Sequence, residues 1–121
     1  MNFFVKIFLE EQDTYALGPG RMELLRSVEE LGSLRKAAQK LGMSYRWAWG
    51  RLNDAEKVLH VSLLAKDPNS GGKAKTLTPE ARELLAWYKA IEEEMAGLLE
   101  RAAASCPGFL KKSWPEKNGR K

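Results

Sequence analysis

Residues 32–52 read GSLRKAAQKLGMSYRWAWGRL, and the remaining elements can be built outward from this stretch. It joins a short helix to a longer one through Gly42, because a sharp turn between two helices requires a positive φ. The pair Ala37-Ala38 is small enough for the two helices to cross closely, and Ser44 can cap the second helix. The pattern predicts a helix-turn-helix whose second helix, over about 44–59, has an exposed amino-terminal half.

Upstream of this motif the sequence predicts a β-hairpin and one further helix. The aromatic and β-branched run Phe3–Leu9 indicates a strand rather than a signal peptide, because charged residues interrupt and follow it, and Thr14–Leu17 can fold back on it. Gly18-Pro19-Gly20 ends the extended chain, and proline suits the first turn of a helix because it has no backbone N–H. That helix is expected to end at Gly32, after apolar residues at three-residue steps.

Downstream, a second hairpin and a long helix are expected. Residues 63–65 and 75–77 flank a run of turn-forming residues, which predicts a wing over about 63–77. Thr78-Pro79-Glu80 opens a helix that should run over about 78–104. The predicted fold class is mainly α with small β, a winged helix-turn-helix domain over 1–104. The basic, aperiodic segment 105–121 is expected to be a flexible tail.

The long helix carries an apolar seam with alternating steps of four and three residues, as in a coiled coil. A helix of roughly 27 residues spans some 40 Å at about 1.5 Å per residue, which is more than a domain of this size can easily cover. The seam can serve the intramolecular core or a dimer contact, and we expect its later part to pair two copies of the chain. The predicted dimerisation residues are Tyr88, Ile91, Met95, Leu98 and Ala102.

Composition and charge narrow the class of function. The 121 residues are 44% hydrophobic and 30% charged, which fits one globular domain without a membrane-spanning run. Cys106 is the only cysteine, so no disulfide framework or cysteine-rich zinc site is expected, and a cytoplasmic location is favoured. Residues 33–77 carry nine basic and three acidic groups. A solvated face would explain such a cluster, but its coincidence with the helix-turn-helix favours DNA binding.

The second helix of the motif is expected to enter the major groove of duplex DNA. Arg46 and Arg51 are the expected guanine or phosphate contacts, and Gly71-Gly72 would let the wing approach the DNA backbone closely. Trp49 is assigned to packing, whereas Trp47 could either pack or stack on bases. The predicted DNA-binding residues are Ser44, Tyr45, Arg46, Trp47, Gly50, Arg51, Lys66, Lys73 and Lys75.

Other classes of function have little support in the sequence. The single histidine, His60, and the cysteine, Cys106, are far apart and lie in no recognisable catalytic context, so no enzyme activity is expected. Glu92-Glu93-Glu94 point in different directions on a helix and are expected to be solvated, so no metal and no cofactor are predicted. The competing interpretation is a winged-helix module that binds another protein and has no affinity for DNA.

Several motifs of this chain occur together in one known family. They are Leu17-Gly18-Pro19-Gly20-Arg21, Gly32-Ser33, Ala37-Ala38, Gly42-Met43-Ser44-Tyr45-Arg46-Trp47-Ala48-Trp49, Gly71-Gly72-Lys73 and Leu77-Thr78-Pro79. Through them the sequence resembles the amino-terminal DNA-binding domain of the ModE family of molybdate-responsive transcriptional regulators, over about residues 3–104. The resemblance implies a winged helix-turn-helix whose long terminal helix pairs two subunits. It also implies that Ser44–Arg51 reads DNA and that the wing touches the DNA backbone.

The chain departs from that family at two points. Full-length members continue into oxyanion-binding domains, which need about another hundred residues on ordinary domain sizes, whereas this sequence ends at Lys121. The expectation is DNA binding without an integral molybdate sensor, unless a separate effector-sensing protein supplies one. The tip of the wing, Asp67-Pro68-Asn69-Ser70, is also poorer in glycine than is usual in the family.

Overall fold

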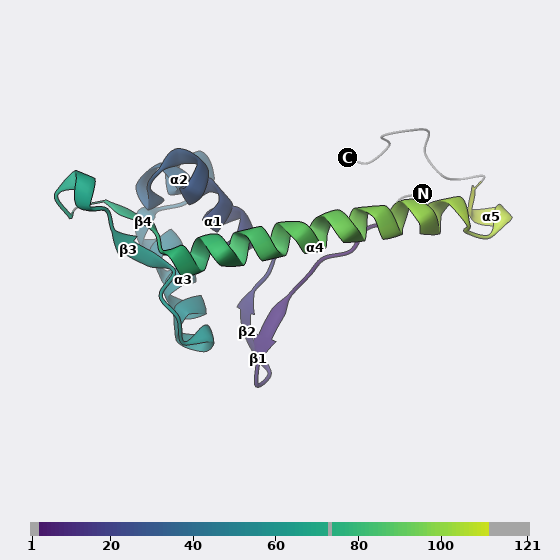
Figure 1. Ribbon diagram of the computed structural model, residues 1–121, viewed down its shortest axis with the longest axis horizontal. Coiled ribbons are helices and arrows are strands. Elements are labelled where there is room, and N and C mark those ends of the chain that lie inside the picture. The colour runs from purple at the N-terminus through teal and green to yellow at the C-terminus, as the bar shows by residue number, and fades with distance from the viewer. Residues whose placement is uncertain (1–2, 73, 112–121) are drawn as a thin grey trace. The chain divides into compact units, whose positions relative to one another are not determined.

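The structure is a computed structural model that describes residues 3–72 and 74–111 of the chain (Figure 1). Its elements are mainly helical, with two small antiparallel hairpins, and the mainly α fold with small β that the sequence predicts is confirmed. The chain divides into two compact units. We call Lys6–Trp87 the helix-turn-helix unit, and residues 3–5 together with 88–111 the terminal unit.

The first hairpin pairs β1 (Leu9–Glu11) with β2 (Thr14–Leu17). Gln12 and Asp13 form its two-residue turn with φ values of 50° and 65°, the left-handed geometry that suits the twist of a tight hairpin. The hairpin is as predicted, but the expectation of a strand over Phe3–Leu9 is wrong, since β1 begins only at Leu9. Leu9 lies opposite Leu17, the last residue of β2.

The central helix of the helix-turn-helix unit is α1 (Pro19–Leu31). Its side chains Met22, Leu25 and Val28 are fully buried at the three-residue spacing that the sequence predicts. Gly32 ends the helix in the left-handed region, with a φ of 90°, and its N–H donates to the Val28 carbonyl at 2.8 Å. The predicted start and end of this helix are both confirmed.

The helix-turn-helix consists of α2 (Leu34–Lys40) and α3 (Tyr45–Leu59), joined by a turn at Gly42 with a φ of 70°. Ser33 and Ser44 cap the two helices, each hydroxyl accepting from the backbone N–H three residues on, at 3.2 and 3.1 Å. Small buried side chains let the helices pack closely. The buried residues of this pair are Leu34, Ala37, Ala38, Ala48, Leu52 and Ala55. The predicted bounds of the second helix, about 44–59, agree with those of α3 to within one residue.

The wing is the hairpin of β3 (Leu64–Lys66) and β4 (Lys75–Leu77), with a 3-10 helix, η1 (Pro68–Ser70), between them. The expected first strand, residues 63–65, begins one residue too early, since β3 begins at Leu64 and the Leu63 N–H donates to a carboxylate. That carboxylate is Glu56 of α3, whose Oε2 accepts from the Leu63 and Leu64 N–H groups at 2.7 and 3.0 Å. The start of the wing is thereby fixed to α3.

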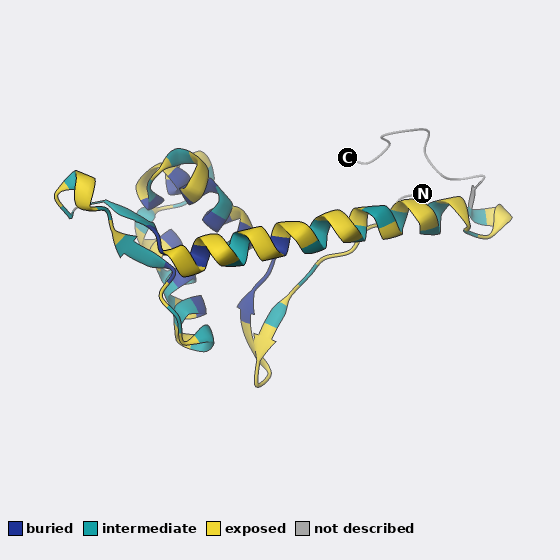
Figure 2. Ribbon diagram, in the orientation of Figure 1, coloured by how far each residue is buried: buried dark blue, intermediate teal, exposed yellow. Residues whose placement is uncertain are grey.

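The long helix, α4 (Pro79–Ala104), is as predicted. Thr78 caps it, since its hydroxyl accepts from the N–H three residues on at 3.1 Å and donates to the Ser62 carbonyl at 2.7 Å. Buried and half-buried positions recur along α4 between exposed ones (Figure 2). A short helix, α5 (Gly108–Lys111), lies in the segment expected to be a tail, and residues 112–121 lie outside the described residues. None of the helices in the described part of the chain is long and apolar enough to cross a membrane.

Candidate nucleic-acid interface

The amino-terminal half of α3 is the exposed part of the helix-turn-helix. Arg46 and Trp47 are exposed there, Trp47 to 59% of its surface. Gly50 faces open space, since a Cβ built on it would meet no atom of the described residues within 4 Å. The opposite side of the same helix is core, with Ala48 and Leu52 fully buried. This part of α3 therefore presents a basic and aromatic surface with a gap at Gly50.

Five of the predicted DNA-binding residues line one cleft of about 330 Å³ at the start of α3. We call it the α1–α3 cleft, because residues of both helices form its wall. The predicted residues that line it are Ser44, Arg46, Trp47, Gly50 and Arg51. Two further lining residues, Arg21 of α1 and Asp54 of α3, were not among the predicted ones. The structure thus brings the exposed half of α3 and the first turn of α1 together at one place.

Arg51 is held between α3 and the start of α1. The centre of its guanidinium lies 5.8 Å from the centroid of the Trp47 ring, within the range of a cation–π contact. Its Nη2 atom approaches Gly20 so closely that a Cβ at that position would lie 2.9 Å from it. Its Nε is buried and has no hydrogen-bond partner among the described residues. The guanidinium is therefore packed in one place while part of its donor capacity is unused.

Arg21 is the functional candidate that the sequence did not reveal. Its side chain is only 12% exposed, its Nη1 donates to the Ala16 carbonyl at 2.8 Å, and its guanidinium lies 4.5 Å from the centroid of the Tyr15 ring. Its Nη2 lies 4.0 Å from the Asp54 Oδ2. A cation in the first turn of a helix opposes the helix dipole, and this unfavourable placement is the signal that could have identified Arg21.

Tyr45, the remaining predicted residue of α3, does not line the cleft. It is half-buried, and the guanidinium of Arg35 on α2 lies 4.6 Å from the centroid of its ring. Arg35 is exposed and was not among the predicted contacts. The stacked pair adds a second aromatic ring and a further cation to the surface beside the start of α3.

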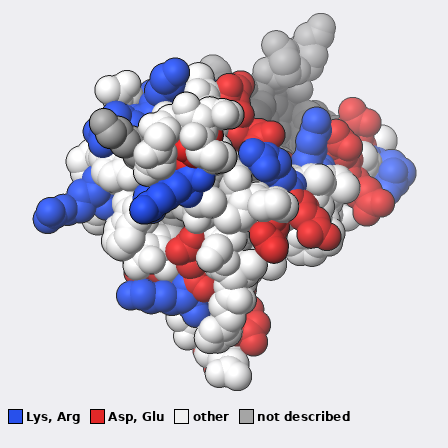
Figure 3. Space-filling model, turned by 60° about the vertical axis from the view of Figure 1, so that its left-hand side comes forward, with Lys and Arg blue, Asp and Glu red and all other residues white. Residues whose placement is uncertain are grey.

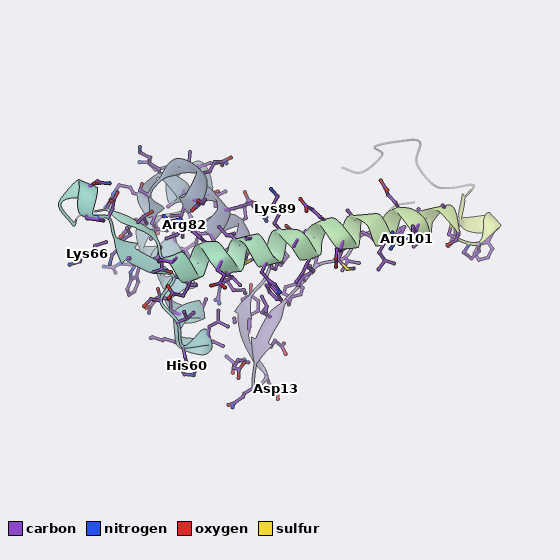
Figure 4. The ribbon with its side chains drawn as sticks, in the orientation of Figure 1. Asp13, His60, Lys66, Arg82, Lys89 and Arg101 are labelled. Carbon is purple, nitrogen blue, oxygen red and sulfur yellow. The ribbon has the colours of Figure 1, made fainter. Side chains whose placement is uncertain are left out.

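The wing carries Lys66 and Lys75 at directly opposite positions of β3 and β4. Lys66 is exposed (Figure 4) and Lys75 is half-buried. Neither residue lines the α1–α3 cleft, so the structure does not bring the wing lysines into the same cavity as the arginines of α3. The predicted Lys73 lies outside the described residues. On the face drawn in Figure 3, Lys and Arg predominate on the left of the view and Asp and Glu on the right.

The assignment of Trp49 to interior packing is wrong. Its side chain is 41% exposed, although its neighbour in sequence, Ala48, is fully buried. Successive residues of a helix are turned by about 100°, so the residue after a buried one leaves the narrow apolar stripe of α3. Trp47, for which both packing and base stacking were open, is exposed and lies beside Arg51. Both tryptophans therefore belong to the accessible surface of α3.

Comparison with known proteins gives one family and several relatives. Residues 20–82 match the family described as "Bacterial regulatory helix-turn-helix protein, lysR family". The "Transcriptional regulator ModE" of Haemophilus influenzae is 31% identical over 94 residues, which make up 75% of this chain and 36% of that protein. The "Molybdenum-pterin-binding protein MopB" of Rhodobacter capsulatus is 36% identical over 86 residues, 69% of this chain and 31% of that protein. The "Molybdenum transport protein ModE" of Azotobacter vinelandii is 28% identical over 101 residues, 83% of this chain and 37% of that protein.

These similarities cover most of this chain but only about a third of the length of each relative. The residues that match the family extend from α1 through the helix-turn-helix and the wing to the first turn of α4. The matched region therefore contains every element that lines the α1–α3 cleft.

Proposed function

The chain belongs to the lysR family of bacterial regulatory helix-turn-helix proteins, and from that premise we propose that it is a sequence-specific transcriptional regulator that acts as a homodimer on duplex DNA. It is related to the ModE regulators over most of its length, and this relationship is to regulators rather than to enzymes. The observation that carries the proposal is the meeting of Arg46, Trp47, Gly50 and Arg51 at one cleft on the exposed half of α3. A helix that follows a helix-turn-helix turn uses such groups to contact bases and phosphates in the major groove.

In the proposed complex α3 lies in the major groove with its amino-terminal half toward the base edges. Arg46 can donate to O6 and N7 of guanine, while the rings of Tyr45 and Trp47 supply apolar contacts. The open position at Gly50 lets the helix backbone come close to the groove without a steric conflict. The wing would contact phosphates through Lys66, Lys73 and Lys75.

The seam of α4 supports the proposed homodimer. Tyr88 is buried in the single chain, whereas Leu98 is 46% exposed and Ile91, Met95 and Ala102 are half-buried. A second copy of the helix would cover these apolar side chains, which is favourable by about 25 cal/mol per Å² of apolar surface removed from water. Two-fold pairing would direct two copies of α3 to a pseudo-palindromic site, with half-sites about one helical turn or a multiple apart.

The names of the relatives refer to molybdenum, and this supports a role for the chain in regulating molybdenum-related genes. The chain matches about a third of the length of each relative, and the part of that role that we assign to it is DNA binding. Its DNA target and its single cysteine support a cytoplasmic location.

Electrophoretic mobility shifts with duplex DNA at increasing salt test the proposal. The logarithm of the binding constant should fall linearly with the logarithm of salt concentration, because neutralised phosphates release their counterions. Arg46→Ala should weaken binding to a site selected from a random library by about tenfold, through loss of a guanine contact worth roughly 1–3 kcal/mol. Lys89→Ala, which removes one exposed cation from α4, is the matched control and should bind like the wild type. A folded wild-type chain that shifts no duplex at low salt would instead favour the protein-binding module.

A further inference from the structure

The α1–α3 cleft has an excess of guanidinium groups. Arg21, Arg46 and Arg51 line it, and Asp54 is the one carboxylate among the described residues that do so. Arg21 and Arg51 each keep a buried Nε without a hydrogen-bond partner among the described residues. A buried N–H donor without an acceptor is unfavourable, and a guanidinium pairs strongly with an oxyanion through two adjacent N–H groups. The cleft therefore offers the excess of positive charge that an oxyanion requires.

We infer that this cleft binds one phosphate group of the DNA backbone, with Arg51 as the direct ligand and Arg21 as the second positive charge of the site. The inference rests on the proposed function and assigns different contacts with DNA to the two arginines of α3. Arg51 contacts the phosphate, and Arg46, which is exposed beside it, reads a base. Arg21 joins the DNA-binding surface from α1, outside the helix-turn-helix itself.

The position of Arg51 favours a phosphate over a base. Its guanidinium lies against the Trp47 ring and the backbone at Gly20, so it is directed along the surface toward α1 instead of outward from α3. A side chain on the flank of a helix in the major groove faces the sugar-phosphate backbone, whereas base edges lie below the helix. Phosphate contacts carry no sequence information, so the loss of Arg51 should affect all duplexes alike.

Gly20 is the positioning residue for Arg51. A methyl group at this position would lie 2.9 Å from the Arg51 Nη2, which is the end of a flexible side chain and can move away. Gly20 lies in the first turn of α1, and alanine is a better helix former than glycine. Gly20→Ala should therefore displace the guanidinium while it preserves the fold.

Asp54 opposes the phosphate. Its carboxylate is 64% exposed and lies 4.0 Å from the Arg21 Nη2. A second anion in the cleft has to share that guanidinium with Asp54 and is repelled by its charge. Asp54→Asn keeps the shape of the side chain and removes the charge, so it should strengthen the binding of duplex DNA of any sequence.

The first experiment compares variants on two duplexes, one selected from a random library by the wild-type protein and one scrambled. Arg51→Ala should weaken binding to both by the same factor, about fivefold to tenfold, and should reduce the salt slope by about 0.9. Gly20→Ala should weaken both duplexes to a lesser degree with the melting temperature unchanged or raised, and Asp54→Asn should strengthen both. Asp13→Asn, in the turn of the first hairpin, is the charge-matched control for Asp54→Asn and should leave binding unchanged. An Arg51→Ala variant that loses affinity only for the selected duplex would assign Arg51 to a base and overturn the inference.

The second experiment locates the phosphate. Single neutral methylphosphonate linkages are placed in turn along the selected duplex, and binding of the wild type and of Arg51→Ala is compared at each position. At one linkage per half-site the wild type should lose clearly more affinity than Arg51→Ala, because the variant has already lost the Arg51 contact and only the charge of Arg21 still acts there. Equal sensitivity of the two proteins at every linkage would show that Arg51 contacts no phosphate.

Free inorganic phosphate carries the same oxyanion as the DNA backbone and is the alternative ligand of the α1–α3 cleft. Inorganic phosphate, added at constant ionic strength in place of chloride, should not compete with the selected duplex beyond the effect of chloride. Competition that Arg51→Ala abolishes would make the cleft a site for a free oxyanion and would overturn its assignment to the DNA backbone. If the wild type binds duplex DNA with a steep salt dependence while Arg51→Ala and Gly20→Ala both bind like it, this inference fails and the proposed function stands.

Discussion

α3 and α4 are both amphipathic, but their apolar faces are covered to different degrees. In α3 the side chains of Ala48, Leu52 and Ala55 are completely buried within the single chain. In α4 the seam beyond Tyr88 is only partly covered, and Leu98 is exposed. A helix whose apolar face is fully packed is held rigidly and can present its other face to a ligand. A helix with exposed apolar residues in a regular seam requires a further apolar surface.

Both helices are thus amphipathic, and they differ in how completely the single chain buries their apolar faces. The exposed side of α3 holds Arg46, Trp47 and an open glycine, which suits contact with a polar groove. The incompletely covered side of α4 is aliphatic, which suits contact with a second copy of the same helix. This contrast leads to predictions that differ in kind for the two helices.

The largest effect is expected from the packed face of α3. Leu52→Ala removes a fully buried side chain and should lower the free energy of unfolding by about 3 kcal/mol, because a large-to-small change in a core adds a cavity to the lost burial. Urea denaturation followed by circular dichroism measures the change. Asn53→Ala, at the adjacent half-buried position, is the control and should cost less than about 1 kcal/mol. Equal losses for the two variants would show that the interior face of α3 is not packed as the structure describes.

The seam of α4 should respond through association instead of unfolding. Leu98→Asp places a charge where the proposed partner helix packs, and it should weaken the dimer by about 2 kcal/mol, the value of burying one leucine side chain. Sedimentation at several concentrations measures this, and at concentrations low enough for both proteins to be monomeric the variant should unfold at nearly the same urea concentration as the wild type. Ala96→Asp adds the same charge at an exposed position of α4 outside the seam and should leave the association constant unchanged. A Leu98→Asp protein that sediments like the wild type would remove the seam from the interface.

The comparison also shows which features a sequence can predict. Helix ends were predictable, because Ser33, Ser44 and Gly32 act on the backbone next to them and need no distant partner. The first strand was misplaced because it begins at Leu9, opposite the last residue of β2, Leu17, and not at the start of the apolar run. The seam of α4 was visible as a pattern, but its degree of coverage was not.

The candidate site also contains residues that the sequence could predict and residues that it could not. The residues of α3 that line the cleft share one helix face and follow from helical spacing, whereas Arg21 joins them only through the packing of α1 beside α3. Trp49 was misassigned because residue type favours burial while its angular position on α3 opposes it. Glu56 is a third case, since its carboxylate caps the start of the wing through two N–H groups that are distant from it in sequence.

The smallest effect is expected at the surface of α1, where two adjacent carboxylates form ion pairs with cations of two other helices. Glu30 accepts a hydrogen bond from Lys40 Nζ of α2 at 2.9 Å, and Glu29 lies 3.2 Å from Arg82 Nε of α4. The hydrogen bond from Lys40 to Glu30, with the charge of that carboxylate, raises the pKa of Lys40 above its usual 10.5. Because the folded-state pKa is the higher one, the stability from this pair is fully present below about pH 10.5 and is lost as the pH rises through the raised value.

Glu30→Gln should therefore lower the midpoint of thermal unfolding slightly at neutral pH, since an exposed ion pair contributes little. The midpoints of this variant and of the wild type should converge above the folded-state pKa of Lys40, where the wild-type lysine is neutral. Glu29→Gln is the matched control, because Arg82 keeps its charge throughout this range, so its small difference from the wild type should not depend on pH. A difference for Glu30→Gln that persists unchanged above that pH would mean that the contact between α1 and α2 depends on shape and not on the charge of Lys40.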